Sequence, residues 1–241
     1  MIFKDNYTTT NLLFAQPVTF TIYIDEQHML IPIGTFQMKM PTYYMSTFDN
    51  NFKILAGLLN SPFMDIQKQF EPIAQFDSIY GMFLSFGMGI DKYSSFYFTT
   101  IKQAFALLGM DLEVNRGAML INSVPIDEQV LVRITRIILM ALALKKPSDF
   151  IDDPQLQAYQ DKINRIKSKN QSKTVSSNFE HSFMILTYEF NYKPDEILNM
   201  TPYLINTLIS YTGKSIRYKT TLIAAGNGNT KKVKFITDKG K

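Results

Sequence analysis

The sequence contains no cysteine, no tryptophan and only two histidines. Without cysteine the chain cannot form a disulfide framework, a thiolate metal site or a cysteine nucleophile. The histidines, His28 and His181, stand 153 positions apart, and nothing in their surroundings predicts that they converge on a transition metal. We therefore predict no catalytic, cofactor-binding or metal-ligating residues, and no cofactor.

Long hydrophobic runs are also missing. The longest, residues 137–144, is far shorter than the roughly 20 residues that a membrane span requires. The opening stretch MIFKDNYTTT is polar and lacks the apolar segment of a signal peptide. A hydrophobic fraction of 46% and an aromatic fraction of 13% are ample for a folded core. We expect a soluble, intracellular, globular protein without a membrane partner.

Motifs that carry chemistry are absent or incomplete. No serine lies between glycines at a strand-to-helix turn, the arrangement that exposes a nucleophile. The triplet Gly213-Lys214-Ser215 resembles the end of a phosphate loop, but the upstream glycine is lacking and the segment is expected within a helix. Asp149, Asp152 and Asp153 lack the spacing of a calcium loop and suit the start of a helix instead. These absences predict a protein that is not an enzyme.

Charge is unevenly distributed along the chain. The segment from Lys214 to Lys241 contains eight Lys or Arg and one Asp, so its net charge is +7. Because the whole chain has a net charge of +4, the remaining residues sum to −3. A basic terminus of this kind is either a solvated, partly disordered tail or a contact for phosphates or an acidic partner.

The first half of the chain predicts a mixture of strands and helices. Residues 18–24 alternate apolar and polar side chains, which is typical of a strand with one buried face, and residues 29–40 form the returning strand of a hairpin. Pro32 and Gly34 within that second strand indicate an outer position or a bulge. A helix is expected from about residue 42 to residue 59.

Interrupted helices, a second hairpin and a strong helix follow. Residues 63–109 predict broken helical segments, with Gly109 just past the end of the last. Residues 112–124 predict a small hairpin that turns at Arg116-Gly117. Residues 127–144 carry an apolar stripe of helical period that widens to most of the surface, so we place this helix at the centre of the core, ended by Lys145-Lys146-Pro147.

The pattern changes after residue 150, and three parts are predicted. They are an α+β domain over residues 1–150, a helical and charged linker over residues 151–178, and a helical module with the basic tail over residues 179–241. Ser177 with Glu180 predicts a capping box that opens the module. The predicted fold class is α+β, predominantly α-helical, with an N-terminal β-hairpin, a helical core with a second small hairpin, and a C-terminal helical module.

Two short helices that meet at Thr201-Pro202 within residues 197–209 raise the question of a DNA-reading helix-turn-helix. Thr201 suits an N-cap and Pro202 the first helical position. A sequence-reading helix requires Arg, Lys, Asn or Gln at its exposed start, whereas this one offers Tyr203 and Asn206 and no cation before Lys214. The pair of helices is better suited to bury apolar surface against another helix.

The layout resembles a known family. The opening hairpin, the helical block, the charged stretch DPQLQAYQDKINRIKSKNQ and the C-terminal stretch EILNMTPYLINTLI are similar to those of tail assembly chaperones of long-tailed bacteriophages, over about residues 18–218. The resemblance implies a non-enzymatic protein of the host cytoplasm that binds the tape-measure protein and keeps it soluble during tail assembly. It implies tape-measure or other tail proteins as partners and allows a homo-oligomer, and it carries no specific binding residues over to this chain.

Two other functions stay open. The long N-terminal part with its second hairpin is also compatible with a structural tail or baseplate component of the virion. A nucleic-acid-binding protein that acts through the basic C-terminus is the second alternative, although we do not expect nucleic acid as a partner because the module lacks base-reading side chains.

Overall fold

The computed structural model describes residues 1–26, 29–70, 76–89, 92–145 and 178–226. Its first layer is an antiparallel sheet in the order β1 (Ile2–Asp5), β2 (Val18–Glu26), β3 (Met29–Met38). The predicted hairpin is confirmed, and β3 is an outer strand with a register irregularity opposite Ile22 and Tyr23. β1 was not predicted, because its residues lie in the stretch that we interpreted only as a polar N-terminus.

The helix expected over residues 42–59 is in fact two helices, α2 (Tyr43–Phe48) and α3 (Asn50–Asn60). Asp49 separates them. Its backbone N–H donates to the Met45 carbonyl at the end of α2, and its carboxylate accepts from the Phe52 N–H, 2.8 Å away, at the start of α3. One aspartate thus caps both helices, and the single-helix prediction was wrong because it gave no weight to that capping side chain.

Three further helices confirm the interrupted pattern: α4 (Phe63–Phe70), α5 (Ile79–Met88) and α6 (Lys92–Leu107). The end of α6 is as predicted, because Gly109 adopts a left-handed φ of 76°. The N–H of Met110 reaches back to the Phe105 carbonyl at 3.0 Å, which completes a Schellman motif.

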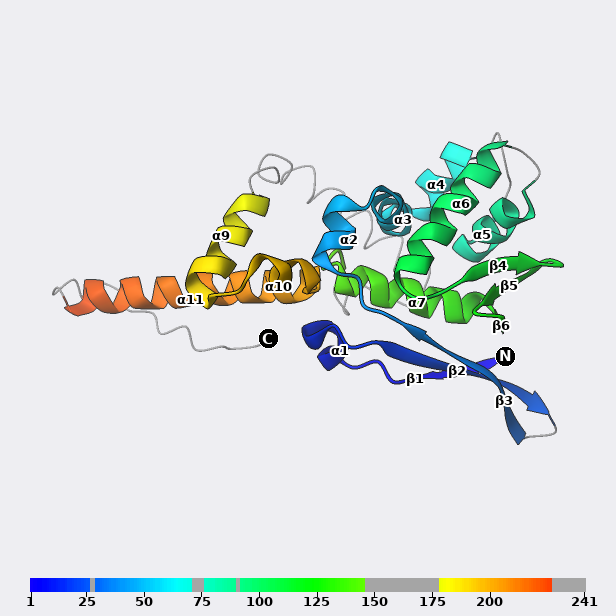
Figure 1. The fold of residues 1–241 in the computed structure, drawn as a ribbon, viewed down its shortest axis with the longest axis horizontal. Coiled ribbons are helices and arrows are strands. Elements are labelled where there is room, and N and C mark those ends of the chain that lie inside the picture. Colours follow the sequence, from blue (N-terminus) through cyan, green and yellow to red (C-terminus); the bar gives the residue numbers. More distant parts are fainter. Residues whose placement is uncertain (27–28, 71–75, 90–91, 146–177, 227–241) are drawn as a thin grey trace.

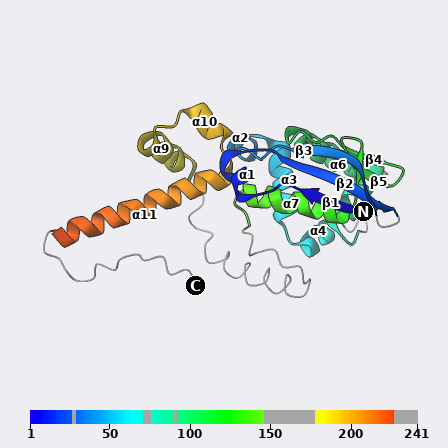
Figure 2. The same cartoon turned by 90° about the horizontal axis from the view of Figure 1, so that it is seen from below.

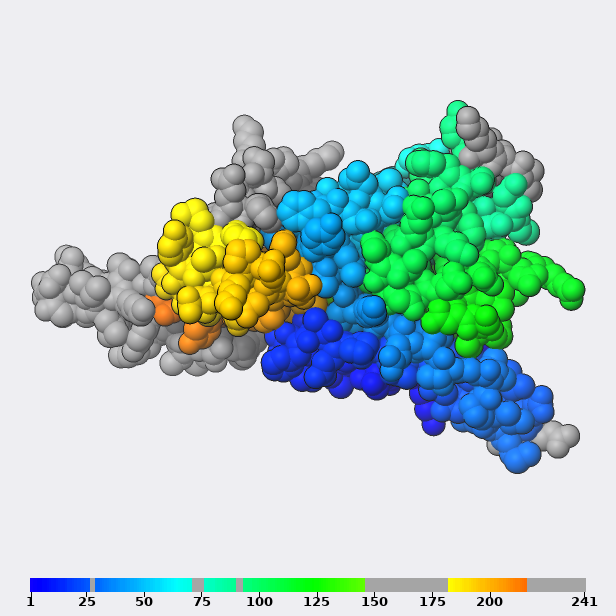
Figure 3. Space-filling view, in the orientation of Figure 1, coloured from blue at the N-terminus to red at the C-terminus, as the bar shows by residue number. Residues whose placement is uncertain are grey.

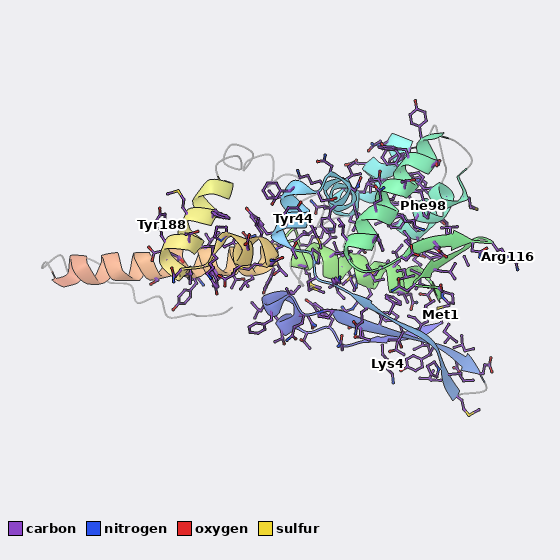
Figure 4. All side chains as sticks on the ribbon, viewed as in Figure 1. Met1, Lys4, Tyr44, Phe98, Arg116 and Tyr188 are labelled. Atoms are coloured by element: carbon purple, nitrogen blue, oxygen red, sulfur yellow. The ribbon has the colours of Figure 1, made fainter. Side chains whose placement is uncertain are left out.

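The second sheet contains β4 (Leu112–Asn115), β5 (Ala118–Ile121) and β6 (Val124–Ile126) in that order. The predicted hairpin turn is confirmed, with positive φ at Arg116, labelled in Figure 4, and at Gly117. The expected second strand ends early, because Asn122 and Ser123 form another left-handed turn that leads into β6. The Asn122 side chain holds this turn by accepting from the Asp111 N–H and donating to the Gly109 carbonyl.

Helix α7 (Glu128–Ala141) follows and lies at the centre of the main core, as predicted. Asp127 is its N-cap and accepts from the Val130 N–H at 3.1 Å. The helix ends before Lys145 because Ala143 turns left-handed with φ 55°, and the Leu144 N–H bonds back to the Leu139 carbonyl. The helix therefore ends before the expected residue 144, while Lys146 and Pro147, which were predicted to terminate it, lie outside the described residues.

The C-terminal module consists of α9 (Asn178–Phe190), α10 (Pro194–Asn199) and α11 (Pro202–Gly226). It has its own small hydrophobic cluster around Leu186, Ile197, Met200 and Ile205. The Thr201 hydroxyl caps α11 as predicted, by accepting from the Leu204 N–H at 3.1 Å.

These parts form an elongated molecule. In Figure 1 the first sheet lies along one side of α7, helices α3 to α6 lie on the other, and the second sheet closes one end. The C-terminal module lies at the opposite end, and α11 extends away from the body in both Figure 1 and Figure 2. The fold is α+β and predominantly α-helical, as predicted. Within the described ranges, no helix is long and apolar enough to cross a membrane.

Several predictions fall on other residues. The following features lie outside the described residues: most of the proposed linker over 151–178, the acidic residues Asp149, Asp152 and Asp153, the side chains of the Ser177–Glu180 capping box, and the tail from residue 227. The division into domains at residues 150 and 178 therefore stays a prediction.

Gly34→Ala is expected to lower the free energy of unfolding by about 2 kcal/mol, because overpacking displaces a well-packed neighbour. A Cβ at Gly34 would lie 2.8 Å from Cγ1 of Val124 and closer still to Cγ2, and Val124 is buried between the two sheets. Gly57→Ala in α3 is the control: a Cβ there meets no atom within 4 Å, so helix propensity should raise stability by about 0.5–1 kcal/mol. Urea unfolding measures both, and equal effects would contradict the packing argument.

Candidate functional site

One ion pair lies where the first sheet meets the central helix. Arg133 Nε donates to Asp5 Oδ2 at 2.8 Å, Arg133 Nη2 donates to Asp5 Oδ1 at 3.2 Å, and the guanidinium stacks on the Tyr7 ring at 5.1 Å. The Tyr7 N–H also donates to Asp5, and its hydroxyl contacts Met140 Sδ at 3.7 Å. Because every group is engaged by the fold itself, we assign this cluster a structural role. Elsewhere in the described chain no three His, Asp or Glu side chains group as a metal site would require.

Burial raises the pKa of the Tyr7, Tyr43 and Tyr80 phenols above the usual value near 10, and the Arg133 guanidinium partly opposes this at Tyr7. A folded-state pKa above the unfolded one stabilises the protein below pH 10, and this contribution is lost as pH rises through the folded value. We expect a flat free energy of unfolding from about pH 7 to 9 and a decline above about pH 10. Denaturant titration at each pH measures it. A stability that rises above pH 10 would contradict the prediction, and Tyr7→Phe should weaken the decline.

One surface hollow lies between α1 (Thr9–Phe14) and the C-terminal module. α1 is short, and Asn11 holds both of its ends: its side-chain oxygen accepts from the Thr8 N–H at 2.7 Å, and its amide donates to the Pro17 carbonyl. Ala15 then turns left-handed with φ 51°. This geometry buries Leu12 and presents Phe14, whose side chain is 68% exposed.

The opposite wall is α10 and the start of α11. Pro194 occupies the first turn of α10, and the Glu196 carboxylate accepts from the Lys193 N–H at 2.8 Å. Ile197 and Met200 face the small C-terminal cluster, while Asp195 and Glu196 are exposed on the wall.

Two hydrogen bonds join the C-terminal module to the N-terminal part of the chain, and the first of them joins these two walls. The Thr201 hydroxyl, completely buried, donates to the Leu12 carbonyl at 2.6 Å. The Tyr43 N–H of α2 donates to the Met200 carbonyl at 2.7 Å. In Figure 3 the dark-blue surface of the N-terminal residues accordingly meets the amber surface of the module. The position of one wall relative to the other therefore depends on the docking of the module.

We call this hollow the α1–α10 groove. Its volume is about 440 Å³, within the range of specific binding sites. Its lining residues are Leu13, Phe14, Ala15, Asp195, Glu196, Asn199, Met200 and Leu204. The groove is thus apolar along its floor and on the α1 side, and acidic on the α10 side. A second hollow of about 320 Å³, between α3, α4 and α6, is lined by Ile54, Leu58 and Phe96 among others.

Exposed apolar side chains also gather at the far end of the first sheet. Strand register brings Ile2 beside Tyr23, which in turn lies beside Pro32, and Ile31 is next to that proline. We call the set the distal patch: Met1, Ile2, Met29, Leu30 and Ile31, each at least 38% exposed and distributed over both faces of this end of the sheet, because successive side chains of a strand alternate. Figure 4 labels Met1 and, beside it on β1, Lys4, whose ammonium lies over the Tyr23 ring at 5.5 Å.

The structure also places the residues that the sequence singled out. Gly213, Lys214 and Ser215 lie within α11, as expected, so they form no phosphate loop. Tyr203 is half-buried against the main core instead of facing outward at the start of α11. Side-chain contacts of His28 and His181 fall outside the described residues. The groove itself was not predicted, although the apolar pattern of residues 197–209 indicated a helix-burying surface.

Comparisons of the chain with protein-family models, with curated proteins and with solved structures found no match.

Proposed function

We propose that this chain is a non-enzymatic tail assembly chaperone of the kind found in long-tailed bacteriophages, which binds the tape-measure protein and keeps it soluble while the tail is built. The observation that carries the proposal is the α1–α10 groove, an open hollow with apolar side chains on both walls. A long helical client exposes apolar stripes before assembly, and a groove between helices masks such stripes by helix-in-groove contact.

The stretch that resembles the chaperone family also contributes to this groove. EILNMTPYLINTLI covers residues 196–209, and Glu196, Asn199, Met200 and Leu204 of that stretch line the groove. This coincidence supports the proposal, because the part of the sequence that suggested the family is the part that builds one wall of the candidate site.

Co-expression with the tape-measure protein tests the proposal. The native chain should increase the soluble fraction of that protein and co-purify with it. Phe14→Ser should abolish both effects, because it removes the most exposed aromatic side chain of the groove without entering the core. Tyr188→Ser is the matched control: Tyr188, labelled in Figure 4, is 80% exposed on α9 and does not line the groove. A native chain that neither solubilises nor binds the tape-measure protein would refute the proposal.

A structural component of the virion tail is the second candidate. The distal patch favours it, because an apolar patch at the opposite end of the molecule from the groove gives the chain two separate contact surfaces. Mass spectrometry of purified virions separates the two candidates: a structural component is present in stoichiometric amount, whereas an assembly chaperone is absent.

A further inference from the structure

We propose that the α1–α10 groove selects amphipathic helices that carry a row of basic side chains along the flank facing α10. This inference rests on the proposed function, because it names the chemistry of the client segment that the groove accepts. Its basis is the unequal charge of the two walls. The α10 wall carries the exposed carboxylates of Asp195 and Glu196, whereas the α1 wall contributes only Leu13, Phe14 and Ala15.

The charge of the groove is of one sign. Its eight lining residues include two carboxylates and no cation. Lys193 precedes Asp195 on the chain but does not line the groove. One carboxylate oxygen of Glu196 accepts from the Lys193 N–H, and among the described residues no protein donor bonds to its other oxygen or to either oxygen of the Asp195 carboxylate. A client lysine or arginine on this flank would therefore find carboxylate acceptors directly beside the apolar floor.

The same lining favours a helix over an extended peptide. Every lining residue belongs to α1, α10, α11 or their caps, so the groove presents side chains and no strand edge with which an extended peptide could pair. A helix whose apolar residues recur every three or four positions can place them against Leu13, Phe14 and Leu204 while its flank faces Asp195 and Glu196. Electrostatic complementarity of this kind chiefly sets which partner is accepted.

The test uses two synthetic amphipathic peptides of about 18 residues, each roughly 27 Å long as a helix. Both carry the same leucine stripe, and one carries lysines along one flank where the other carries glutamates. We expect the lysine peptide to bind the full-length chain about tenfold more tightly at low salt, measured by fluorescence anisotropy. The difference should shrink to about threefold or less near 300 mM salt, because exposed charges are then screened. Equal affinity for the two peptides at low salt would overturn the proposal.

A matched pair of charge variants tests whether the preference for the lysine peptide comes from the groove. Asp195→Asn with Glu196→Gln removes both carboxylates yet keeps an acceptor for the Lys193 N–H, so α10 should remain capped. Asp25→Asn with Glu26→Gln makes the same chemical change at the exposed end of β2, which is remote from the groove. The first variant should weaken the lysine peptide about fivefold and the second less than about twofold. Equal weakening by both would show only a general effect of net charge and would overturn the proposal.

Other occupants would be recognised by distinct results. If neither peptide binds and the chain self-associates until Phe14→Ser is introduced, the groove holds a second copy. If the lysine peptide binds only after Lys231, Lys232 and Lys234 are replaced by serine, the chain's own basic segment occupies the groove. Either result would overturn the proposal. If the variant Asp195→Asn with Glu196→Gln binds the lysine peptide as tightly as the native chain and still solubilises the tape-measure protein, the chaperone function stands and the charge selection alone is refuted.

Discussion

Phe70→Ala is expected to lower the free energy of unfolding by about 3–5 kcal/mol, the usual cost of deleting a buried aromatic ring. Phe70 is only 1% exposed and is the node of an aromatic cluster. Its ring centroid lies 4.8 Å from that of Tyr97 and 5.1 Å from that of Phe86, both in edge-to-face geometry, and 6.4 Å from that of Phe76. The substitution therefore leaves a cavity and removes three ring contacts, of which those with Phe86 and Tyr97 join α4 to α5 and α6 and that with Phe76 joins it to the segment before α5.

Phe96→Ala is the control for this prediction. Phe96 lies on α6 and its ring also contacts Tyr97, at 5.6 Å, but its side chain is 59% exposed. We expect a loss of less than about 1 kcal/mol, because little apolar surface returns to water and no cavity forms. Urea unfolding followed by circular dichroism compares the two variants. Similar losses in both would mean that α4 is not held by the aromatic cluster.

Asp5→Ala is expected to cost about 2–3 kcal/mol. The Asp5 side chain is 9% exposed, and its carboxylate holds the Arg133 guanidinium through two hydrogen bonds and the Tyr7 N–H through a third. Its removal leaves a half-buried cation without its counter-ion and a backbone donor without its acceptor, and such orphaned groups cost more than the pair contributed. We place the expected cost below that of a fully buried pair because Arg133 is 32% exposed and water can reach it.

A double variant tests this reasoning. Asp5→Leu combined with Arg133→Met replaces both partners by apolar side chains, so no charge remains without a partner. We expect it to be more stable than Asp5→Ala by at least about 1 kcal/mol, and thermal and urea unfolding measure the difference. A double variant that is less stable than the single variant would show that the ion pair itself, and not the unpaired cation, dominates the effect.

The elements that the sequence predicted well share one property: their signal is local. The alternation of residues 18–24 predicted β2, Gly109 predicted the end of α6, and Arg116-Gly117 predicted the first turn of the second sheet. The Thr201 cap belongs to the same group. In each case the deciding chemistry lies within a few residues, namely a side-chain period, a positive φ or a capping oxygen.

Most of the incorrect or missing predictions concern elements that depend on contacts between residues far apart in the sequence, which no local pattern indicates. β1 was interpreted as a polar terminus because it contains Lys4 and Asp5, and no local pattern shows that Asp5 pairs with Arg133, 128 positions away. The turn at Asn122 and Ser123 uses left-handed residues other than glycine, held in part by the bonds of Asn122 to residues 109 and 111. The helix split at Asp49 is a different case, because the capping aspartate was visible in the sequence and was not weighed.

The sequence by itself determined the class of this protein: a predominantly helical α+β chain with two β-hairpins, a buried central helix and a C-terminal helical module. Side-chain period, capping residues and turn residues are sufficient for that. Only the tertiary structure decided where the groove lies. Its walls come from residues 13–15 and 195–204, and the Thr201–Leu12 hydrogen bond joins them across 189 positions. Such a surface exists only after the module has docked, because each wall alone is an ordinary amphipathic helix end.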